Sequence, residues 1–230
     1  MKYKDMEPAF FLERPNRFIA FVETGAGKEV CHVKNTGRCK ELLSPRAQVY
    51  VQRNHDPKRK TPLDLITVLK GERLINMDSQ VPNQVAKEWV LSSGFVSQDA
   101  MIKPEKKFRD SRFDLYMEDG NRKIFMEVKG CTLEEEGVCR FPDAPTVRGS
   151  KHVKELIEAK KAGYEAYILF VIQMENVKYI RPNERTDPDF CKALWEAYQA
   201  GVGVLAIDCH IEIDEIIAGK PVKVVLDEIA

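Results

Sequence analysis

Two segments of alternating polar and apolar residues, joined by a turn, constrain the fold more than any other part of the chain. Residues 111–117 and 125–130 both follow the two-residue period of a β-strand. Between them, Asp119-Gly120-Asn121 supplies residues that tolerate a positive φ in a tight turn. The pattern therefore predicts a β-hairpin. One face of this hairpin would carry the apolar residues Phe113, Leu115, Met117, Met126 and Val128.

The opposite face of the hairpin would bring together three charged side chains, Asp114, Glu127 and Lys129. Metal-assisted hydrolysis of a phosphodiester requires such a set. Two carboxylates hold Mg²⁺, a hard cation that prefers oxygen ligands, and the ion activates a water molecule. A nearby ammonium group orients that water or stabilises the developing charge. We predict that Asp114 and Glu127 bind Mg²⁺, with Mn²⁺ as an alternative ion, and that Lys129 completes the catalytic set.

The Glu-x-Lys motif has low specificity on its own. Three such triplets occur in the chain, and only Glu127-Val128-Lys129 lies in a predicted strand. A hairpin with one solvated polar face would show the same pattern, so this interpretation stands beside the catalytic one. In its strand context, the arrangement of an aspartate followed by Glu-x-Lys resembles the PD-(D/E)XK nuclease superfamily.

Short strand-like runs, separated by turn residues, dominate the first 80 residues. The runs span residues 16–24, 28–34, 47–53, 63–70 and 72–78. Five short strands, with a single helical turn at 38–43, suit a small barrel. The five-stranded OB-fold, which commonly binds oligonucleotides, is the expected form. We therefore predict an OB-like nucleic-acid-binding domain at residues 1–80.

Basic residues lie near the ends of these strands. Residues 1–80 carry 15 Lys and Arg against 10 Asp and Glu, whereas the rest of the chain carries 21 against 26. A basic half favours contacts with phosphates, although charge blocks are also usual on solvated surfaces. The turn Asn35-Thr36-Gly37-Arg38 can offer backbone amides and a guanidinium to one phosphate. The predicted nucleic-acid contacts in this half are Arg17, Lys34, Asn35 and Arg38.

The remaining residues alternate between helices and strands, which predicts an α/β domain with a mixed sheet at residues 81–230. The predicted helices span 81–92, a segment that begins within 141–152 and ends near Gly163, and 188–200. The predicted strands after the hairpin span 166–173 and 202–208, and a short terminal segment at 222–226 completes the alternation. Glu88, at the edge of the apolar face of the first helix, is predicted as a third metal ligand. The alternative is an ordinary surface glutamate.

Residues 141–152, rich in Pro and Gly, lead into the second of these helices. A polar loop before a helix N-terminus can bind anions. Arg148, Lys151 and His152 would add donors to it, and we predict that they contact nucleic acid. Arg112, on the charged face of the hairpin, would also hold the nucleic-acid backbone. A metal-ligand role for His152 is the less favoured alternative, because a phosphate-contacting or surface imidazole is simpler.

Composition predicts a soluble protein of the cytoplasm without a membrane partner. A length of 230 residues with 43% hydrophobic residues is enough for one large or two small domains. No apolar run approaches the roughly 20 residues of a membrane span, and the N-terminus lacks the apolar core of a signal peptide. The six cysteines are scattered at spacings that match no zinc motif, which indicates reduced thiols.

Several separated motifs, spread along nearly the whole chain, point to one known family. They are Arg14-Pro15-Asn16-Arg17-Phe18, Asn35-Thr36-Gly37-Arg38, Val81-Pro82-Asn83, Ser111-Arg112-Phe113-Asp114, Glu127-Val128-Lys129, Thr132-Leu133 and residues 141–152. In this order they resemble the sugar fermentation stimulation protein A (SfsA) family. The resemblance implies an N-terminal OB-like domain, a PD-(D/E)XK nuclease-like domain and DNA as the partner. Two functions follow from it: a Mg²⁺-dependent DNA phosphodiesterase, or a non-enzymatic DNA-binding regulator of sugar metabolism genes.

Overall fold

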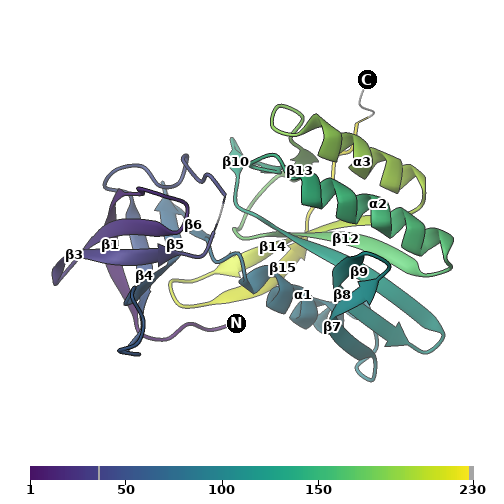
Figure 1. Ribbon diagram of the computed structural model, residues 1–230, viewed down its shortest axis with the longest axis horizontal. Coiled ribbons are helices and arrows are strands. Elements are labelled where there is room, and N and C mark those ends of the chain that lie inside the picture. Colours follow the sequence, from purple (N-terminus) through teal and green to yellow (C-terminus); the bar gives the residue numbers. More distant parts are fainter. Residues whose placement is uncertain (36, 228–230) are drawn as a thin grey trace.

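The chain forms two domains that lie side by side, a small β-barrel and a larger α/β domain (Figure 1). The structure is a computed structural model, and it describes residues 1–35 and 37–227. The first six strands build the barrel. They are β1 (Met6–Glu13), β2 (Ile19–Thr24), β3 (Gly27–Val33), β4 (Gln48–Arg53), β5 (Leu63–Lys70) and β6 (Arg73–Asn76).

Strand pairing closes this barrel. Its strands follow the order β3-β2-β1-β4-β5-β6, and β3 also pairs with β5 in parallel, with Cys31 opposite Leu63. Inward side chains form its core, among them Ala9, Phe11, Ala20, Val22, Val49, Val51 and Leu65. The predicted OB-like barrel is therefore confirmed, with β1 to β5 as its five strands and β6 as an extension.

Strand β1 lies outside the predicted set, which begins at residue 16. The reason is Pro8, because a proline cannot donate to a strand ladder and so argues against a strand. Here Pro8 lies opposite Tyr50 of β4, exposed on the outer surface. The strand still follows a two-residue period, since Ala9 and Phe11 are buried while Pro8 and Phe10 are exposed.

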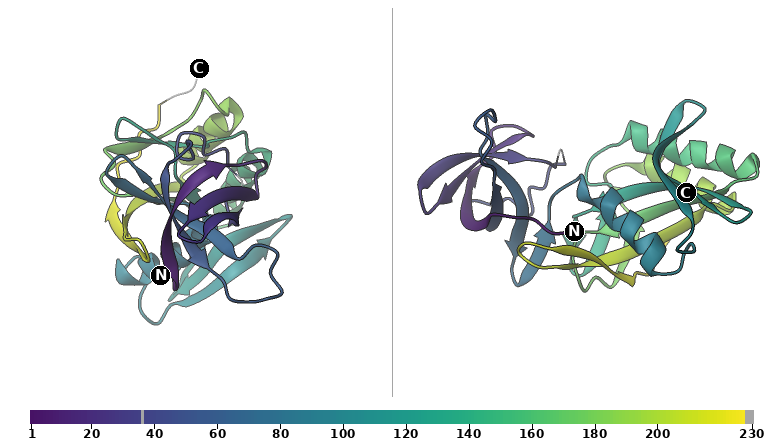
Figure 2. Two further views of the ribbon diagram at one scale, coloured as in Figure 1. Left: turned by 90° about the vertical axis from the view of Figure 1, so that its left-hand side faces the viewer. Right: turned by 90° about the horizontal axis from the view of Figure 1, so that it is seen from below.

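The α/β domain is a six-stranded mixed sheet with helices on both faces (Figures 1 and 2). The strand order is β15-β14-β12-β9-β8-β7. The neighbours β9, β12 and β14 pair in parallel, whereas β15 with β14, β8 with β9 and β7 with β8 pair antiparallel. The bounds are β7 (Met101–Phe108), β8 (Ser111–Asp119), β9 (Arg122–Cys131), β12 (Glu165–Ile172), β14 (Gly203–Ile211) and β15 (Ile216–Pro221). A second, three-stranded sheet contains β10 (Glu134–Glu135), β11 (Val138–Phe141) and β13 (Tyr179–Pro182). The predicted α/β domain with a mixed sheet is confirmed.

Two apolar clusters hold the helices on this sheet. On one face, α1 (Val81–Ser92) packs Val85 and Val90 with residues such as Met126. On the other, α2 (Val147–Lys161) and α3 (Pro188–Gln199) bury side chains such as Leu156 and Phe190. Burying such side chains supplies about 1.5–3 kcal/mol each. Among the described residues, no helix combines the length and the apolar character needed to cross a bilayer.

The hairpin of β8 and β9 departs from the prediction at one residue. Leu115 and Met117 join the cluster under α1 as expected, but Phe113 belongs to the cluster under α2 and α3. The strict alternation breaks between Phe113 and Leu115, where Asp114 has no paired residue in either neighbouring strand. In β7, the residue between the two flanking pairs, Glu105, has a positive φ of 51°.

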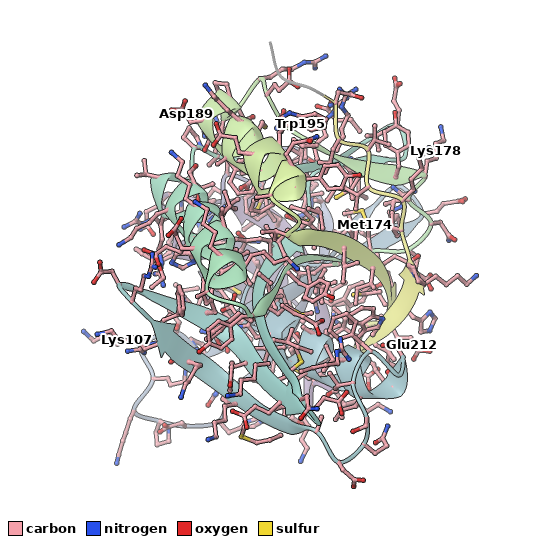
Figure 3. The ribbon with its side chains drawn as sticks, turned by 90° about the vertical axis from the view of Figure 1, so that its right-hand side faces the viewer. Lys107, Met174, Lys178, Asp189, Trp195 and Glu212 are labelled. Atoms are coloured by element: carbon pink, nitrogen blue, oxygen red, sulfur yellow. The ribbon has the colours of Figure 1, made fainter. Side chains whose placement is uncertain are left out.

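Strand β7 forms the outer strand of the sheet and was not among the predicted strands. It is exposed along most of its length and carries Lys103, Lys106 and Lys107 around Pro104. Lysine and proline are uncommon in strands, so the sequence of this segment did not indicate one. Figure 3 shows Lys107 at the outer margin of the sheet. The short terminal segment predicted at 222–226 makes an isolated bridge at Val224, and the last strand of the sheet is β15, just before it.

Several contacts among the described residues join the two domains. The first residues of the chain lie on the α/β domain, where the amide of Tyr3 donates to the carbonyl of Asp214 at 2.7 Å. Lys70 of the barrel donates to the carboxylate of Glu134 at 2.9 Å. The side-chain amide of Gln173, at the end of β12, donates to the carbonyls of Asn76 and Asp78 at 3.1 and 2.9 Å. These contacts cross the division predicted after residue 80.

Candidate active site

Asp114 lies at the point where β8 and β9 stop pairing. The last paired residues are Leu115 and Met126. Beyond them, Oδ2 of Asp114 accepts a hydrogen bond from the backbone amide of Val128 at 2.8 Å. Its Oδ1 accepts one from the side-chain amide of Asn83, in the first turn of α1, at 2.9 Å. The carboxylate is therefore fixed by one helix and one strand.

Glu127 is almost fully buried, with 2% of its surface exposed. Its Oε1 accepts hydrogen bonds from Lys129, with Nζ at 2.7 Å, and from Nδ1 of His152 on α2. Its Oε2 is buried and has no hydrogen-bond partner among the described residues. An unpartnered buried carboxylate oxygen is costly, because it loses water without replacement. Oε2 of Glu127 is therefore available to coordinate a cation or to accept a hydrogen bond.

The environments of the two carboxylates push their pKa values in opposite directions. Burial raises the pKa of Asp114 above its usual value, and the negative charge of Glu127 adds to the increase. Burial also acts to raise the pKa of Glu127. The hydrogen bond from His152 and the charge of Lys129 outweigh it, so the pKa of Glu127 lies below its usual value. Asp114 therefore feels a negative charge that a bound cation would neutralise.

The donor set fits a hard cation that water and substrate complete. No three His, Cys, Asp or Glu side chains within the described residues are arranged to enclose a metal ion. Mg²⁺ does not require such a cage, because it keeps several waters and is usually held by one or two carboxylates and by substrate phosphates. Oε2 of Glu127 and the carboxylate of Asp114 supply donors of this kind.

Glu88, predicted as a third metal ligand, has other partners. Its carboxylate accepts a hydrogen bond from Gln84 at 2.8 Å and lies 3.6 Å from the amino group of Met1. The reason is helical geometry. Asn83 is the α1 residue that contacts Asp114, and a position five residues further along lies about 140° around the helix. The surface alternative for Glu88 is therefore the one that the structure supports.

The predicted phosphate contacts around the helix α2 divide into exposed and buried residues. Arg148 and Lys151 are exposed in its first two turns, and Arg112 is exposed and paired with Glu105 at 3.1 Å. His152 differs, because it is 7% exposed and its Nδ1 contacts Glu127. The helix turns His152 toward β9, away from the exposed Arg148 and Lys151, and its phosphate contact stays a prediction.

The predicted phosphate contacts in the barrel divide in the same way. Arg17 and Arg38 are exposed. Lys34 is largely buried and lies 3.3 Å from the carboxylate of Asp78 and 3.6 Å from that of Asp64, so its charge is already paired. Asn35 accepts the amide of Gly37 through Oδ1 at 2.8 Å, which shapes the turn. Thr36, also part of this predicted turn, lies outside the described residues.

Arg14 and Asn83 have structural roles that the sequence pattern did not predict. Arg14 donates to four backbone carbonyls, those of Arg17, Asn35, Gly37 and Arg38, at 2.6 to 3.0 Å, and thereby holds two loops together. Asn83 orients Asp114. Both residues lie within the motifs that resemble those of the SfsA family. Neither belongs to an apolar repeat, so their presence in those motifs was the one feature of the sequence that could have indicated a role.

A small pocket of roughly 90 Å³ lies beside this site, at the junction of the domains. Asn35 of the barrel lines it together with Gly130 and Thr132, which follow Lys129 along the chain. A β-carbon on Gly130 would lie 2.6 Å from Oε1 of Gln173 and 2.7 Å from Cγ of Pro82. The end of β9 is therefore packed tightly against both helix α1 and strand β12.

Comparison with known protein families identifies both domains. Residues 12–77 match the SfsA N-terminal OB domain, and residues 80–215 match the sugar fermentation stimulation protein RE domain. The chain belongs to the SfsA family. The two matched segments of this SfsA chain meet between residues 77 and 80, close to the predicted division.

Relatives of this SfsA chain match it over nearly their full length. The sugar fermentation stimulation protein homolog of Desulfitobacterium hafniense strain Y51 is 56% identical over 228 residues, which are 99% of this chain and 100% of that protein. The homolog of Clostridium beijerinckii is 52% identical over 226 residues, 98% of this chain and 100% of that protein. A solved structure of Pyrococcus furiosus SfsA in complex with Ca²⁺ is 30% identical, with a TM-score of 0.87 and 98% of both chains covered.

Proposed function

We propose that this protein is a Mg²⁺-dependent DNA phosphodiesterase that holds DNA across both domains. The observation that carries the proposal is the buried Oε2 of Glu127, beside Asp114 and Lys129, which has no hydrogen-bond partner in the part of the chain that the structure describes. The Pyrococcus furiosus relative, described in complex with Ca²⁺, adds support, because Ca²⁺ and Mg²⁺ both prefer oxygen ligands.

Each residue of the site has a distinct task in this proposal. Asp114 and Glu127 would hold Mg²⁺, or Mn²⁺ in its place, and the ion would neutralise phosphate charge and activate a water. Lys129 uses one of its three N–H donors on Glu127, at 2.7 Å. Its other two can orient the water or stabilise charge on a phosphate oxygen. Asn83 and the amide of Val128 keep Asp114 in place.

An exposed aromatic residue on the barrel supplies a surface for nucleic acid. The ring of Phe18 is 45% exposed, and the guanidinium of Arg17 lies 4.8 Å from its centroid. The loop that carries both is preformed, since Oδ1 of Asn16 accepts the amides of Phe18 and Ile19 at 2.9 and 3.0 Å. Rigid aromatic rings beside cationic groups bind unpaired bases by stacking.

The contact between the domains joins this surface to the region of the active site. A β-carbon on Gly37 would lie 2.2 Å from Oδ2 of Asp143, so the barrel loop and the segment leading into α2 touch. Arg38 follows Gly37 in the barrel loop, Arg148 lies in the first turn of α2, and both are exposed. One strand of DNA could therefore contact Arg38 and Arg148 while its backbone reaches Lys129.

A non-enzymatic DNA-binding regulator of sugar metabolism genes is the second candidate. The observation that favours it is the pairing of Oε1 of Glu127 with both Lys129 and His152. These donors already compensate much of the buried negative charge without a metal. On this alternative, DNA binding would depend on salt but not on a divalent ion.

A cleavage screen separates the two candidates. Supercoiled plasmid and single- and double-stranded oligonucleotides are incubated with the protein in Mg²⁺, Mn²⁺ or EDTA. The phosphodiesterase proposal expects cleavage with Mg²⁺ or Mn²⁺ that the Lys129→Ala variant loses. The matched control is Lys123→Ala, an exposed lysine on the same strand. DNA binding without cleavage under any of these ions would favour the regulator.

We also propose the cytoplasm as the compartment in which the protein acts. All six cysteines are buried as free thiols. Thiols of this kind persist in reducing compartments, whereas oxidising ones favour disulfides. Labelling of cysteines in intact cells, followed by mass spectrometry, would detect any oxidised pair and so contradict this assignment.

A further inference from the structure

We infer that His152 is a positioning residue of the active site, which holds Oε1 of Glu127 so that Oε2 alone faces the bound cation. The inference rests on the proposed function in one respect, the presence of a cation at Glu127. It assigns to the histidine a task that is neither metal binding nor phosphate contact.

The hydrogen bond at Nε2 of His152 shows which tautomer of the ring is present. Nε–H of Arg148 donates to Nε2 of His152 at 3.4 Å. A guanidinium only donates, so Nε2 must accept and carries no proton. The proton of the neutral imidazole is therefore on Nδ1. His152 thus donates from Nδ1 to Oε1 of Glu127.

Packing fixes the orientation of this ring. His152 is 7% exposed, and its ring meets that of Phe113 edge-on, with centroids 6.5 Å apart and planes at 75°. Phe113 reaches this position because strand β8 breaks its alternation beside Asp114. The same irregularity that frees Asp114 from the sheet therefore brings an aromatic ring against the histidine.

The hydrogen bonds leave the two oxygens of Glu127 unequal. Oε1 accepts from both Lys129 and His152, whereas Oε2 has no partner within the described residues. A carboxylate held in this way offers one oxygen in a fixed direction. Partners that orient a metal ligand without touching the metal typically change metal affinity 10- to 100-fold when removed.

The test measures Ca²⁺ binding by calorimetry on the full chain without DNA, so that turnover plays no part. His152→Leu removes the donor and is expected to weaken Ca²⁺ binding by about 10- to 100-fold. His152→Asn places an amide donor where Nδ1 lay and is expected to restore affinity to within about threefold of the original chain. Thermal melts without metal check that each variant is folded.

A second readout does not depend on metal or on a buried substitution. The chain has only four histidines, so ¹⁵N-labelled histidine gives a simple NMR spectrum. The spectrum is expected to contain one Nδ1–H imidazole that exchanges slowly with water. Arg148→Ala, a surface change, removes the donor to Nε2 but leaves the acceptor Oε1 of Glu127, so the Nδ1–H signal is expected to remain.

The outcomes separate this inference from the function on which it rests. If the original chain binds no Ca²⁺, the cation proposal fails and the inference fails with it. If the original chain binds Ca²⁺ and folded His152→Leu binds it equally well, the inference alone is wrong. A slowly exchanging Nε2–H in place of Nδ1–H would also overturn it.

Discussion

The backbone amide of Val128 donates to the carboxylate of Asp114 at 2.8 Å, at the position where a regular hairpin would have paired two backbones. The carboxylate of Asp114 thus takes the place of a backbone carbonyl of β8 as the acceptor for the amide of Val128. This exchange satisfies the amide of Val128 and holds Asp114 next to Glu127. The consequence is a pair of carboxylates at a local opening of an otherwise continuous sheet.

Replacing Asp114 by Asn should separate catalysis from binding. The amide oxygen can still accept from Val128, while the charge needed for a cation is lost. We expect cleavage to fall by about 100-fold or more, on the scale of other lost electrostatic contacts, and DNA affinity to change less than about threefold. The control is Asp110→Asn, at an exposed position in the turn of the same sheet. Unchanged cleavage in Asp114→Asn would exclude a catalytic role.

Replacing Gly130 by Ala should destabilise the protein. The added carbon would lie 2.6 Å from Oε1 of Gln173, which is 1% exposed and held by its own hydrogen bonds. Such overpacking typically costs about 1–3 kcal/mol. Gly25→Ala is the control, since no atom of residues 1–35 or 37–227 lies within 4 Å of its added carbon. Denaturant melts of both variants measure the difference, and equal stabilities would show that the junction is looser than described.

Acid should weaken the contact between the domains through Glu134. Burial acts to raise the pKa of Glu134, but hydrogen bonds from Lys70, the amide of Gly137 and Arg73 outweigh burial. They lower the pKa from 4.5 to about 2. The folded protein therefore binds fewer protons than the unfolded chain between these values, and the stabilisation is complete above pH 4.5 and lost toward pH 2.

Glu134→Gln should lack this acid-linked part of the stability. We expect its free energy of unfolding to be lower than that of the original chain at pH 7, and the difference to shrink as the pH falls below 4.5. Urea melts from pH 7 to pH 2.5 measure it. Glu136→Gln, at an exposed neighbouring position, is the control. A difference that is constant with pH would argue against the ion pair.

Replacing Phe18 by Ala should weaken the binding of single-stranded DNA while leaving the fold intact. Stacking of one base on an aromatic ring is worth about 1–3 kcal/mol, which corresponds to a loss of affinity of about 5- to 150-fold. Stability should change by less than about 0.5 kcal/mol, because the ring is 45% exposed. Tyr198→Ala, an aromatic residue on α3 that is 50% exposed, controls for a general surface effect in the fluorescence titration.

Neutral substitution of Arg38 should change the salt dependence of DNA binding, whereas neutral substitution of Lys34 should change the stability of the fold. Arg38 is exposed, so Arg38→Ala should reduce the slope of log K against log salt by about 0.9, the value of one phosphate contact. Lys34 pairs with Asp64 and Asp78. Lys34→Met should therefore lower stability and leave the salt slope unchanged. A reduced slope in Lys34→Met would restore it as a DNA contact.

The sequence predicted the parts of the fold that follow a simple period. The barrel strands β2 to β5, the three long helices and the faces of Glu127 and Lys129 all came from alternation or from helical spacing. Strands β1 and β7 escaped because Pro8 and the lysines of β7 hide the alternation that defines a strand. Their positions depend on pairing with distant strands, which no local pattern reports.

The candidate site was predictable in its charges but not in its contacts. Asp114 and Glu127 were expected to be neighbours, yet their orientation depends on Asn83 and on the end of pairing between β8 and β9. The contact of His152 with Glu127 spans 25 residues and requires α2 to cross β9. Such contacts come from packing between elements, and only a three-dimensional arrangement contains them.

The lysines of β7 have a consequence for how the molecule behaves in concentrated solution. An outer strand with free backbone groups could serve as a template on which a second copy adds its own strand, the first step toward fibrils. Lys103, Lys106 and Lys107 would repel the same residues of an approaching copy, and Pro104 offers no N–H for the ladder. Replacing these lysines by threonine should therefore increase aggregation through the edge strand β7.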